Sequence, residues 1–422
     1  MNLIDKLILL TFPFMDVGFI FFGIPLRIGE LTLFLSIFRI INSKSVLKIK
    51  KINKNGLIIF SLITLNLIFV IFVNFVSEVD SSFYLKYVLR NFIYISIIFS
   101  FLLKPIKYDA IKTDLFIKYI LYLVTFFYFV EFFDYYIYRF GWQDLVFVSR
   151  QGKAVFKDFM IKFAGQSSEP AYIIPLLSIP LIFGLFTRKY IYVVISLLYM
   201  LLSFSSFGYA VILFAFIFFL KSVDDKELLK KVQNFIIKAL MIIPFVLLFF
   251  YEKIEKLMVH NFEKLQTYFG FGNAQEWSAS QRTGHLELAI NLFLDSNFVR
   301  MMIGNGTGYY SKMSKAFTKY YIDDAEEAHN LYASTLTDRG IIGIIVLVLL
   351  FYYISRIKIP KNKNISANLM FFFTAIKFGV YVRMFHWFFT GMLWQYYFWI
   401  EVIILMSANA YYIKVRNERE RN

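Results

Sequence analysis

Long apolar runs, separated by short polar and basic segments, recur along the whole chain. Most runs approach the roughly 20 residues that an α-helix needs to cross the hydrocarbon core of a bilayer. None shows the alternation of polar and apolar residues that a membrane-spanning β-strand needs. The pattern therefore predicts about twelve membrane-spanning helices. They are expected at residues 7–24, 28–43, 57–76, 83–103, 115–138, 169–187, 190–204, 207–220, 234–251, 337–355, 366–382 and 389–411.

Basic segments separate these runs in pairs. They cover residues 44–54, 104–112, 188–189, 221–231, 356–363 and 414–421. Because loops rich in Lys and Arg stay on the cytoplasmic side, we place all six there, together with both chain ends. The chain, 1–422, is then a single integral membrane domain with two long outer, periplasmic loops, 139–168 and 252–336. Loops of that length are expected to carry function.

Composition supports this class. Of the 422 residues 59% are apolar and 21% aromatic, which leaves too little polar surface for a soluble protein. The net charge of +16 falls largely in short loops, where it suits anionic lipid better than nucleic acid. The chain has no cysteine, which excludes disulfides and thiolate metal sites. We predict an all-α polytopic membrane protein with the lipid bilayer as its first partner.

The second outer loop, 252–336, concentrates side chains with chemical capacity. Arg282 opens an amphipathic stretch, and its planar guanidinium suits a phosphate, although a surface charge at the membrane interface explains it as well. His329 stands beside Asn330 in "EEAHNLYASTLTDRGIIG", and an imidazole accepts a proton or, when charged, binds a phosphate. Gly340 and Gly343 are expected where the chain packs closely on entering the membrane.

Other candidates lie at the ends of spans. Glu169 begins a span, where it either caps a helix or orients a sugar hydroxyl. Gly306, in "IGNGTGYY", is expected to let backbone N–H groups approach a phosphate or a sugar. Arg90 lies inside one span and Arg383 near the end of another, where snorkelling to the interface is the alternative. A charge at the bilayer centre costs about 2.5–3.5 kcal/mol, so a functional cavity is the first interpretation.

A metal site is not expected. The acidic run "DDAEE" at residues 323–327 has one histidine nearby, and such a run is more often a solvated face of a loop. No cofactor is expected either, because the glycine-rich stretch lacks the Lys-Ser/Thr ending of a nucleotide-binding loop.

Taken in chain order, several short motifs resemble the O-antigen ligase/polymerase superfamily. This superfamily contains the Wzy-type polymerases of O-antigen, capsule and exopolysaccharide, and the O-antigen ligases of lipopolysaccharide biosynthesis. The motifs are "SSEPAY", "LSFSSFGYA", "QRTGHLELAINLF", "IGNGTGYY" and "AHNLYASTLTDRGIIG". Residues 163–345 carry nearly all of the resemblance. Where the superfamily commonly has an Arg after the Ser of the second motif, this chain has Phe207.

The resemblance implies a GT-C-like, inverting and metal-independent glycosyltransferase at the outer face of the bacterial inner membrane. Its substrates would be undecaprenyl-pyrophosphate-linked oligosaccharides, and its partners a flippase and a chain-length regulator. Arg282 would bind the donor pyrophosphate, His329 would lie near that pyrophosphate or the acceptor hydroxyl, and Glu169 would stand at the edge of the reaction centre. A second phosphate-binding arginine would come from Arg90, Arg150 or Arg383.

Three functions follow from this interpretation. The first is a polymerase that joins lipid-linked repeat units. The second is an O-antigen ligase that transfers the same donor to lipid A-core. The third, which is not an enzyme, is a lipid-linked oligosaccharide flippase, in which charges line a central cavity instead of a long outer loop. The concentration of charges in 252–336 favours an enzyme.

Overall fold

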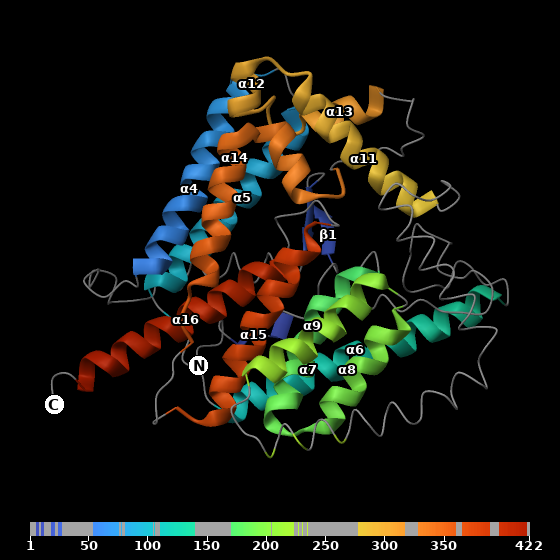
Figure 1. Cartoon of the computed structure of the whole chain (residues 1–422), viewed down its shortest axis with the longest axis vertical. Coiled ribbons are helices and arrows are strands. Elements are labelled where there is room, and N and C mark those ends of the chain that lie inside the picture. Colours follow the sequence, from blue (N-terminus) through green and yellow to red (C-terminus); the bar gives the residue numbers. More distant parts are fainter. Residues whose placement is uncertain are drawn as a thin grey trace.

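The computed structural model describes residues 6–7, 10–11, 18–21, 24–27, 54–75, 77, 81–103, 105, 110–139, 170–203, 205–222, 227, 230, 234, 277–316, 328–359, 365–388 and 396–419. These residues are mainly helical (Figure 1). The elements are β1 (Gly18–Phe21), β2 (Ile24–Arg27), α4 (Lys54–Phe75), α5 (Ser81–Leu103), α6 (Ala110–Arg139), η4 (Pro170–Ile173), α7 (Ile174–Thr187), α8 (Tyr190–Leu202), α9 (Ser206–Ser222), α11 (Trp277–Leu294), α12 (Phe298–Ile303), α13 (Tyr309–Ala316), α14 (Leu331–Ser355), α15 (Ala367–His386) and α16 (Tyr396–Arg419).

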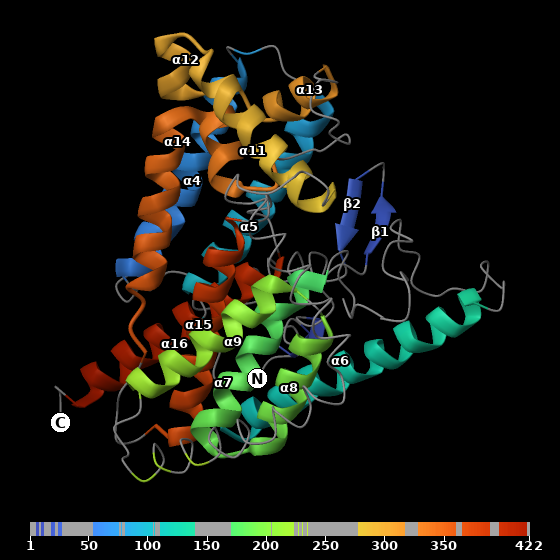
Figure 2. The ribbon, with the colours of Figure 1, turned by 45° about the vertical axis from the view of Figure 1, so that its right-hand side comes forward.

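The first group of helices consists of α4, α5 and α14, with α11, α12 and α13 lying over one end of it (Figure 2). On α4 the buried positions recur every three or four residues, which puts them on one face of a helix. They are Ile59, Ile63, Asn66, Val70 and Val73. This spacing explains how a uniformly apolar run still presents one face to its neighbours.

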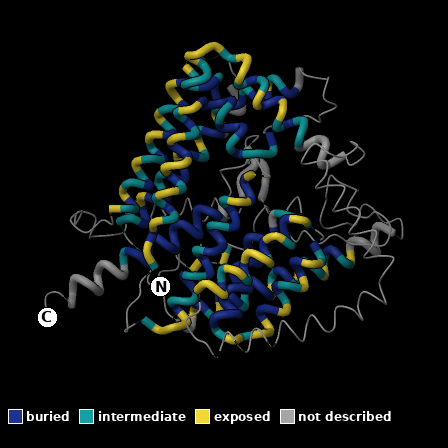
Figure 3. The backbone as a smooth tube through the Cα atoms, in the orientation of Figure 1, coloured by how far each residue is buried: buried dark blue, intermediate teal, exposed yellow. Residues whose placement is uncertain are grey.

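The second group consists of α6, α7, α8, α9, α15 and α16, and α7 is its centre (Figure 1). Every residue of α7 from Ile174 to Phe186 is buried, because α6, α8, α9 and α15 pack around it. A helix that is apolar on all sides is typical of such a central position. Figure 3 colours buried residues dark blue in both groups of helices.

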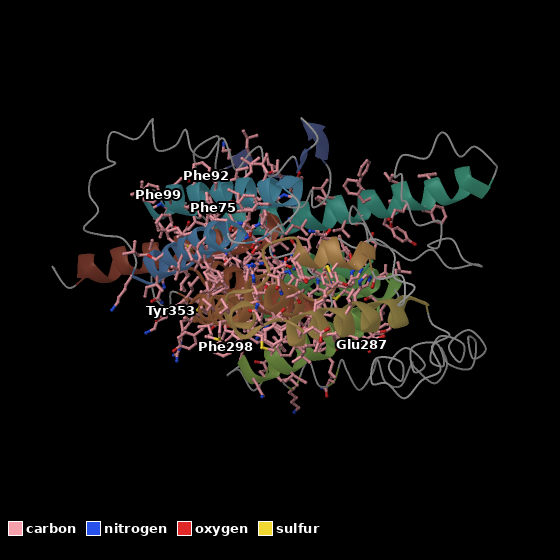
Figure 4. All side chains as sticks on the ribbon, turned by 90° about the horizontal axis from the view of Figure 1, so that it is seen from above. Phe75, Phe92, Phe99, Glu287, Phe298 and Tyr353 are labelled. Atoms are coloured by element: carbon pink, nitrogen blue, oxygen red, sulfur yellow. The ribbon has the colours of Figure 1, made fainter. Side chains whose placement is uncertain are left out.

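Apolar side chains also cover the outside of the molecule. Phe75, Phe92 and Phe99, on α4 and α5, are 91%, 58% and 39% exposed (Figure 4). Exposed aromatic side chains on long apolar helices fit a lipid environment. Among the described residues, four helices are long and apolar enough to cross a membrane, which supports a membrane protein.

Most predicted spans coincide with described helices. The expected ranges at 57–76, 83–103, 115–138, 169–187, 190–204, 207–220, 366–382 and 389–411 overlap α4 to α9, α15 and α16. The range 28–43 lies outside the described residues, as does 234–251 apart from residue 234. The count of about twelve spans therefore stays a prediction.

The predicted helix over 7–24 is wrong at its C-terminal end. Residues Gly18–Phe21 form a strand that pairs antiparallel with Ile24–Arg27. In a short apolar run, periodicity does not distinguish a strand from a buried helix. Here residues 18–21 pair with residues 24–27 and do not continue the predicted helix. The expected all-α class thus needs one correction, a two-stranded hairpin.

α14 is two helices joined at a sharp turn, and not one continuous span. Gly340 has φ 64° and ψ −164°, which is not helical backbone. A Cβ placed on Gly343 would lie 3.3 Å from the Thr335 methyl group, whereas eight residues of straight helix extend about 12 Å. The chain therefore turns back at Gly340. We call residues 331–339 the first arm and 341–355 the second arm.

This turn changes the predicted span at 337–355. As one helix, α14 has the length and hydropathy of a span. The second arm alone is shorter than the roughly 20 residues that cross a bilayer. The non-helical dihedrals of Gly340 place a turn inside α14, so that the whole element is not one continuous span.

Candidate functional site

Two histidines far apart in the sequence meet where α11 passes the start of α14. The ring centroids of His285, on α11, and His329, just before α14, are 4.9 Å apart with an interplanar angle of 65°. His285 is buried at 1% exposure, whereas His329 is partly exposed. His329 is thus the more accessible of two imidazoles in edge-to-face contact.

Tyr310, on α13, holds the buried imidazole from the other side. Its hydroxyl oxygen lies 2.6 Å from Nδ1 of His285 and 3.4 Å from the backbone carbonyl of His285. Burial, and then the nearby Asp338 carboxyl group, raise the pKa of Tyr310 above its usual range. The hydroxyl therefore stays protonated at neutral pH.

The backbone at His329 is unusual. Its φ is +49°, in the left-handed region that few residues other than glycine adopt. Ala328 and Asn330, on either side, fix this conformation: the amide of Ala328 donates to Ser334 Oγ at 3.0 Å, and Asn330 Oδ1 accepts from the amide of Ala333 at 3.0 Å. Strained backbone that neighbouring contacts enforce is common at functional sites.

Asn330 joins the site to the end of α15. While its Oδ1 caps the first arm, its Nδ2 donates to the carbonyl of Phe388 at 2.9 Å. The amide of Leu331 donates to the carbonyl of Trp387 at 3.0 Å. The base of the first arm is therefore fixed at the C-terminal end of an apolar helix, where a site at the membrane boundary is expected. Both polar ends of the Asn330 side chain make structural contacts.

The glycine-rich turn packs against the tip of the first arm. Asp338 accepts hydrogen bonds from the amides of Gly308 at 2.9 Å and Tyr310 at 3.1 Å through its two carboxyl oxygens. Its backbone carbonyl accepts from the amide of Gly306 at 2.9 Å. The amide of Gly306, expected to approach substrate, thus donates to Asp338. Gly304 allows this close packing, since a Cβ there would lie 2.3 Å from the same carbonyl.

Arg339 projects from the tip of the first arm into the first group of helices. Its Nη1 donates to Oδ1 of Asn66 on α4 at 3.1 Å, and its guanidinium lies over the ring of Tyr87 on α5, 5.1 Å from the ring centroid. Arg339 is only 5% exposed. The tip of the arm is therefore anchored between two apolar helices by a charged side chain.

Arg383 lies in a buried cluster of charged and aromatic side chains. Its Nη2 is 3.0 Å from Oε1 of Glu401 on α16, and both side chains are fully buried. One turn further along α15, His386 packs against Phe207, with ring centroids 4.5 Å apart. Phe207, which stands where the superfamily commonly has an arginine, thus contributes an aromatic ring that packs against His386.

Of the remaining predicted residues, only Arg90 has a described side chain. Arg282 is on α11, one turn before His285, and its side chain lies outside the described residues, as do Glu169 and Arg150. Arg90 is partly exposed on α5. Hydrogen bonds of Asn330 and Leu331, which follow His329, connect the base of the first arm with Phe388 and Trp387, just after α15, the helix that carries Arg383.

Sequence reasoning missed Tyr310, Asp338 and Glu401. The two carboxylates had a signal, because each interrupts an apolar run, where an ionisable side chain is costly. Tyr310 had none, since it is one of 29 tyrosines. His285 stands three residues after Arg282 in the motif "QRTGHLELAINLF", but its contact with His329 appears only in the folded chain.

Comparison with known proteins extends this description. Residues 191–348 match the family model Wzy_C, described as O-antigen ligase. The matched range contains Arg282, His285, Gly306 and His329, and excludes Arg383. None of the curated proteins matches the chain. Over residues 191–348 this match supports the expected resemblance to the O-antigen ligase/polymerase superfamily.

Proposed function

We propose that the protein is a polysaccharide polymerase of the bacterial inner membrane. It joins oligosaccharide repeat units carried on undecaprenyl pyrophosphate at the outer face of that membrane, as a GT-C-like, inverting and metal-independent glycosyltransferase. Both chain ends are in the cytoplasm in this proposal, and loop 252–336 belongs to the reaction centre. A flippase supplies the repeat units and a chain-length regulator limits the product.

The observation that carries the proposal is the environment of His329. This residue lies in the stretch that matches the O-antigen ligase family, and its left-handed backbone is held by contacts from both neighbours. Its ring is partly exposed beside a buried imidazole, at the end of an apolar helix. Such a position suits a group that handles a proton where a lipid-linked substrate meets water.

The proposed reaction forms one bond and breaks one bond. The hydroxyl oxygen of the acceptor sugar attacks the anomeric carbon of the donor from the face opposite the pyrophosphate. The bond from that carbon to the pyrophosphate oxygen breaks, the glycosidic bond forms with inversion, and the hydroxyl proton passes to a base. His329 is our choice for this base, and Glu169 is the carboxylate that orients the hydroxyl.

Arginine side chains stabilise the departing pyrophosphate in this scheme. Arg282 has the first role, because it stands one turn before His285 on α11, and a guanidinium stays charged at any physiological pH. For the second arginine we favour Arg90 over Arg383. Arg90 is partly exposed, whereas Arg383 is fully buried and already paired with Glu401. Arg150 stays a candidate outside the described residues.

The second candidate function is an O-antigen ligase. The description of the matching family favours it directly. A ligase would use the same donor and the same groups, but it would transfer the glycan to lipid A-core instead of to another lipid-linked unit. A flippase is less well supported, because members of the matching family are membrane enzymes of the glycosyltransferase type.

A reconstituted assay distinguishes the polymerase function from the ligase function. The purified full chain, in lipid nanodiscs, is given only lipid-linked repeat units. A polymerase produces a ladder of longer lipid-linked glycans, and the ladder persists in a metal chelator. A product that appears only after lipid A-core is added would identify a ligase and overturn the polymerase proposal. Deleting the gene gives a matched cellular result: surface glycan of one repeat unit for a polymerase, and bare core for a ligase.

A further inference from the structure

His285 has no part in the proposed reaction, yet it is a buried polar side chain in direct contact with the ring of His329. It is 1% exposed, and it contacts Tyr310 through Nδ1 and the ring of His329. The three residues, His285, Tyr310 and His329, stand on α11, on α13 and in the segment before α14. A buried imidazole between a tyrosine hydroxyl and a second imidazole needs an explanation, because burying a polar ring is unfavourable unless its nitrogen atoms have partners.

Tyr310 holds His285 through two contacts. Its hydroxyl oxygen lies 2.6 Å from Nδ1 of the buried imidazole and 3.4 Å from the backbone carbonyl of His285. A tyrosine hydroxyl carries one hydrogen, so it donates either to an unprotonated Nδ1, or to the carbonyl while the N–H of Nδ1 donates to the hydroxyl oxygen. In both arrangements the short contact orients the ring and couples its tautomer to the hydroxyl.

Tyr310 is itself held in place by the first arm. Its amide donates to Asp338 Oδ1, and Asp338 Oδ2 accepts from the amide of Gly308. The titratable groups in contact with His285 include Tyr310 on α13 and His329 before α14, and Asp338 in turn accepts a hydrogen bond from the amide of Tyr310. A chain of contacts thus runs from the tip of the first arm back to its base.

We propose that His285 is a positioning residue for His329. Tyr310 fixes the buried imidazole in one orientation and one tautomer, and this imidazole supports the ring of His329 so that it faces the acceptor hydroxyl. The inference rests on the proposed function of His329, but it adds a residue that does not itself touch substrate. Positioning of this kind matters because a misplacement of about 1 Å can lower a rate about 100-fold.

The first test is kinetic. Tyr310→Phe removes only the hydroxyl, and His285→Phe keeps a ring in contact with His329 but removes both nitrogen atoms. We expect both variants to lower kcat for chain extension at least about 10-fold, with KM for the lipid-linked unit changed less than about twofold. The matched control is Tyr309→Phe, which removes the hydroxyl of the neighbouring tyrosine and is expected to keep the wild-type kcat.

The second test is spectroscopic and needs no substrate. The chain has four histidines, so ¹⁵N-histidine labelling in nanodiscs gives few signals, and the signal lost in His285→Phe identifies His285. We expect one preferred tautomer of His285 in the wild type, and loss of this preference in Tyr310→Phe. A mixture of both tautomers in the wild type, or an unchanged preference in Tyr310→Phe, would overturn the proposal.

A third variant separates this inference from the proposed function. His329→Asn removes the imidazole at the reaction centre itself. If His329→Asn extends chains at the wild-type rate, the proposed role of His329 fails, and that of His285 fails with it. If His329→Asn is inactive while Tyr310→Phe and His285→Phe keep the wild-type kcat, only the positioning role of His285 is refuted.

Discussion

At the scale of single residues, burial separates arginines that the sequence presents as equivalent. Arg90 and Arg383 both interrupt apolar helices, and either could bind a phosphate. In the folded chain Arg383 is fully buried against Glu401, whereas Arg90 is partly exposed. Breaking a buried ion pair by removing one partner is strongly destabilising, whereas replacing both by apolar residues is often neutral. This difference gives a way to measure what Arg383 does.

We predict that Arg383→Leu and Glu401→Leu each lower the free energy of unfolding by about 3–5 kcal/mol, because each leaves one buried charge without its partner. The double variant should regain most of that stability and a large part of the chain-extension activity. Thermal unfolding in detergent and the nanodisc assay measure the two quantities. A double variant that is stable but inactive would instead make Arg383 a substrate-binding residue.

At the scale of elements, the reversal at Gly340 determines how the two arms of α14 pack beside the candidate site. It lets Asp338 and Arg339 point in different directions from the tip of the first arm, one toward the glycine-rich turn and the other between α4 and α5. The second arm then returns along the first, with Gly343 against Thr335. His329 lies at the base of the same arm, and this base is fixed by the hydrogen bond from the amide of Leu331 to the carbonyl of Trp387, just after α15.

Gly340→Ala should disrupt this reversal. Its φ of +64° is unfavourable for any residue with a Cβ, by about 1–2 kcal/mol. A Cβ there would also lie 2.5 Å from the carbonyl of Met302, in rigid backbone. We expect a clear loss of folded protein in the membrane and of chain extension, measured by membrane abundance and size-exclusion chromatography.

Gly208→Ala is the matched control, because a Cβ added to Gly208 would lie 3.1 Å from the Ile174 side chain and 3.2 Å from the Met200 carbonyl, both farther than the 2.5 Å at Gly340. It should fold nearly as well as the wild type. Equal abundance of Gly340→Ala and the wild type would contradict the reversal at Gly340.

At the scale of the whole molecule, the two groups of helices meet through a few specific contacts. The base of the first arm is joined to the end of α15, α16 packs against α5, and Nδ2 of Asn409 donates to the carbonyl of Lys358. The arrangement places the segment between α11 and α12 at one end of the molecule and the segment after α14 away from that end (Figure 1). If the positively charged loops are cytoplasmic, these two segments lie on opposite sides of the membrane.

The absence of cysteine makes this topology directly measurable. We predict that Asp295→Cys, between α11 and α12, reacts in intact cells with a maleimide that cannot cross the inner membrane. Lys358→Cys, after α14, should react only once that membrane is permeabilised. Both positions are exposed, so burial does not explain a difference. Equal labelling of both in intact cells would refute the proposed topology.

The sequence alone determined the membrane class and the position of most helices, because long apolar runs have few other stable states than helices in lipid. It also pointed to His329 and Arg282, since the motifs around them are local. It did not determine the strand at Gly18–Phe21, because a short apolar run pairs with whatever segment the fold brings beside it.

Only the tertiary structure decided which groups meet at the site. Gly340 was predicted as a small residue where the chain packs closely on entering the membrane, and in the folded chain its positive φ also makes it a point of reversal. Whether His285 lies beside His329, or Glu401 beside Arg383, depends on packing between elements that are far apart along the chain. Local patterns carry no information on such contacts, because burial and pairing are set by the neighbours that folding supplies.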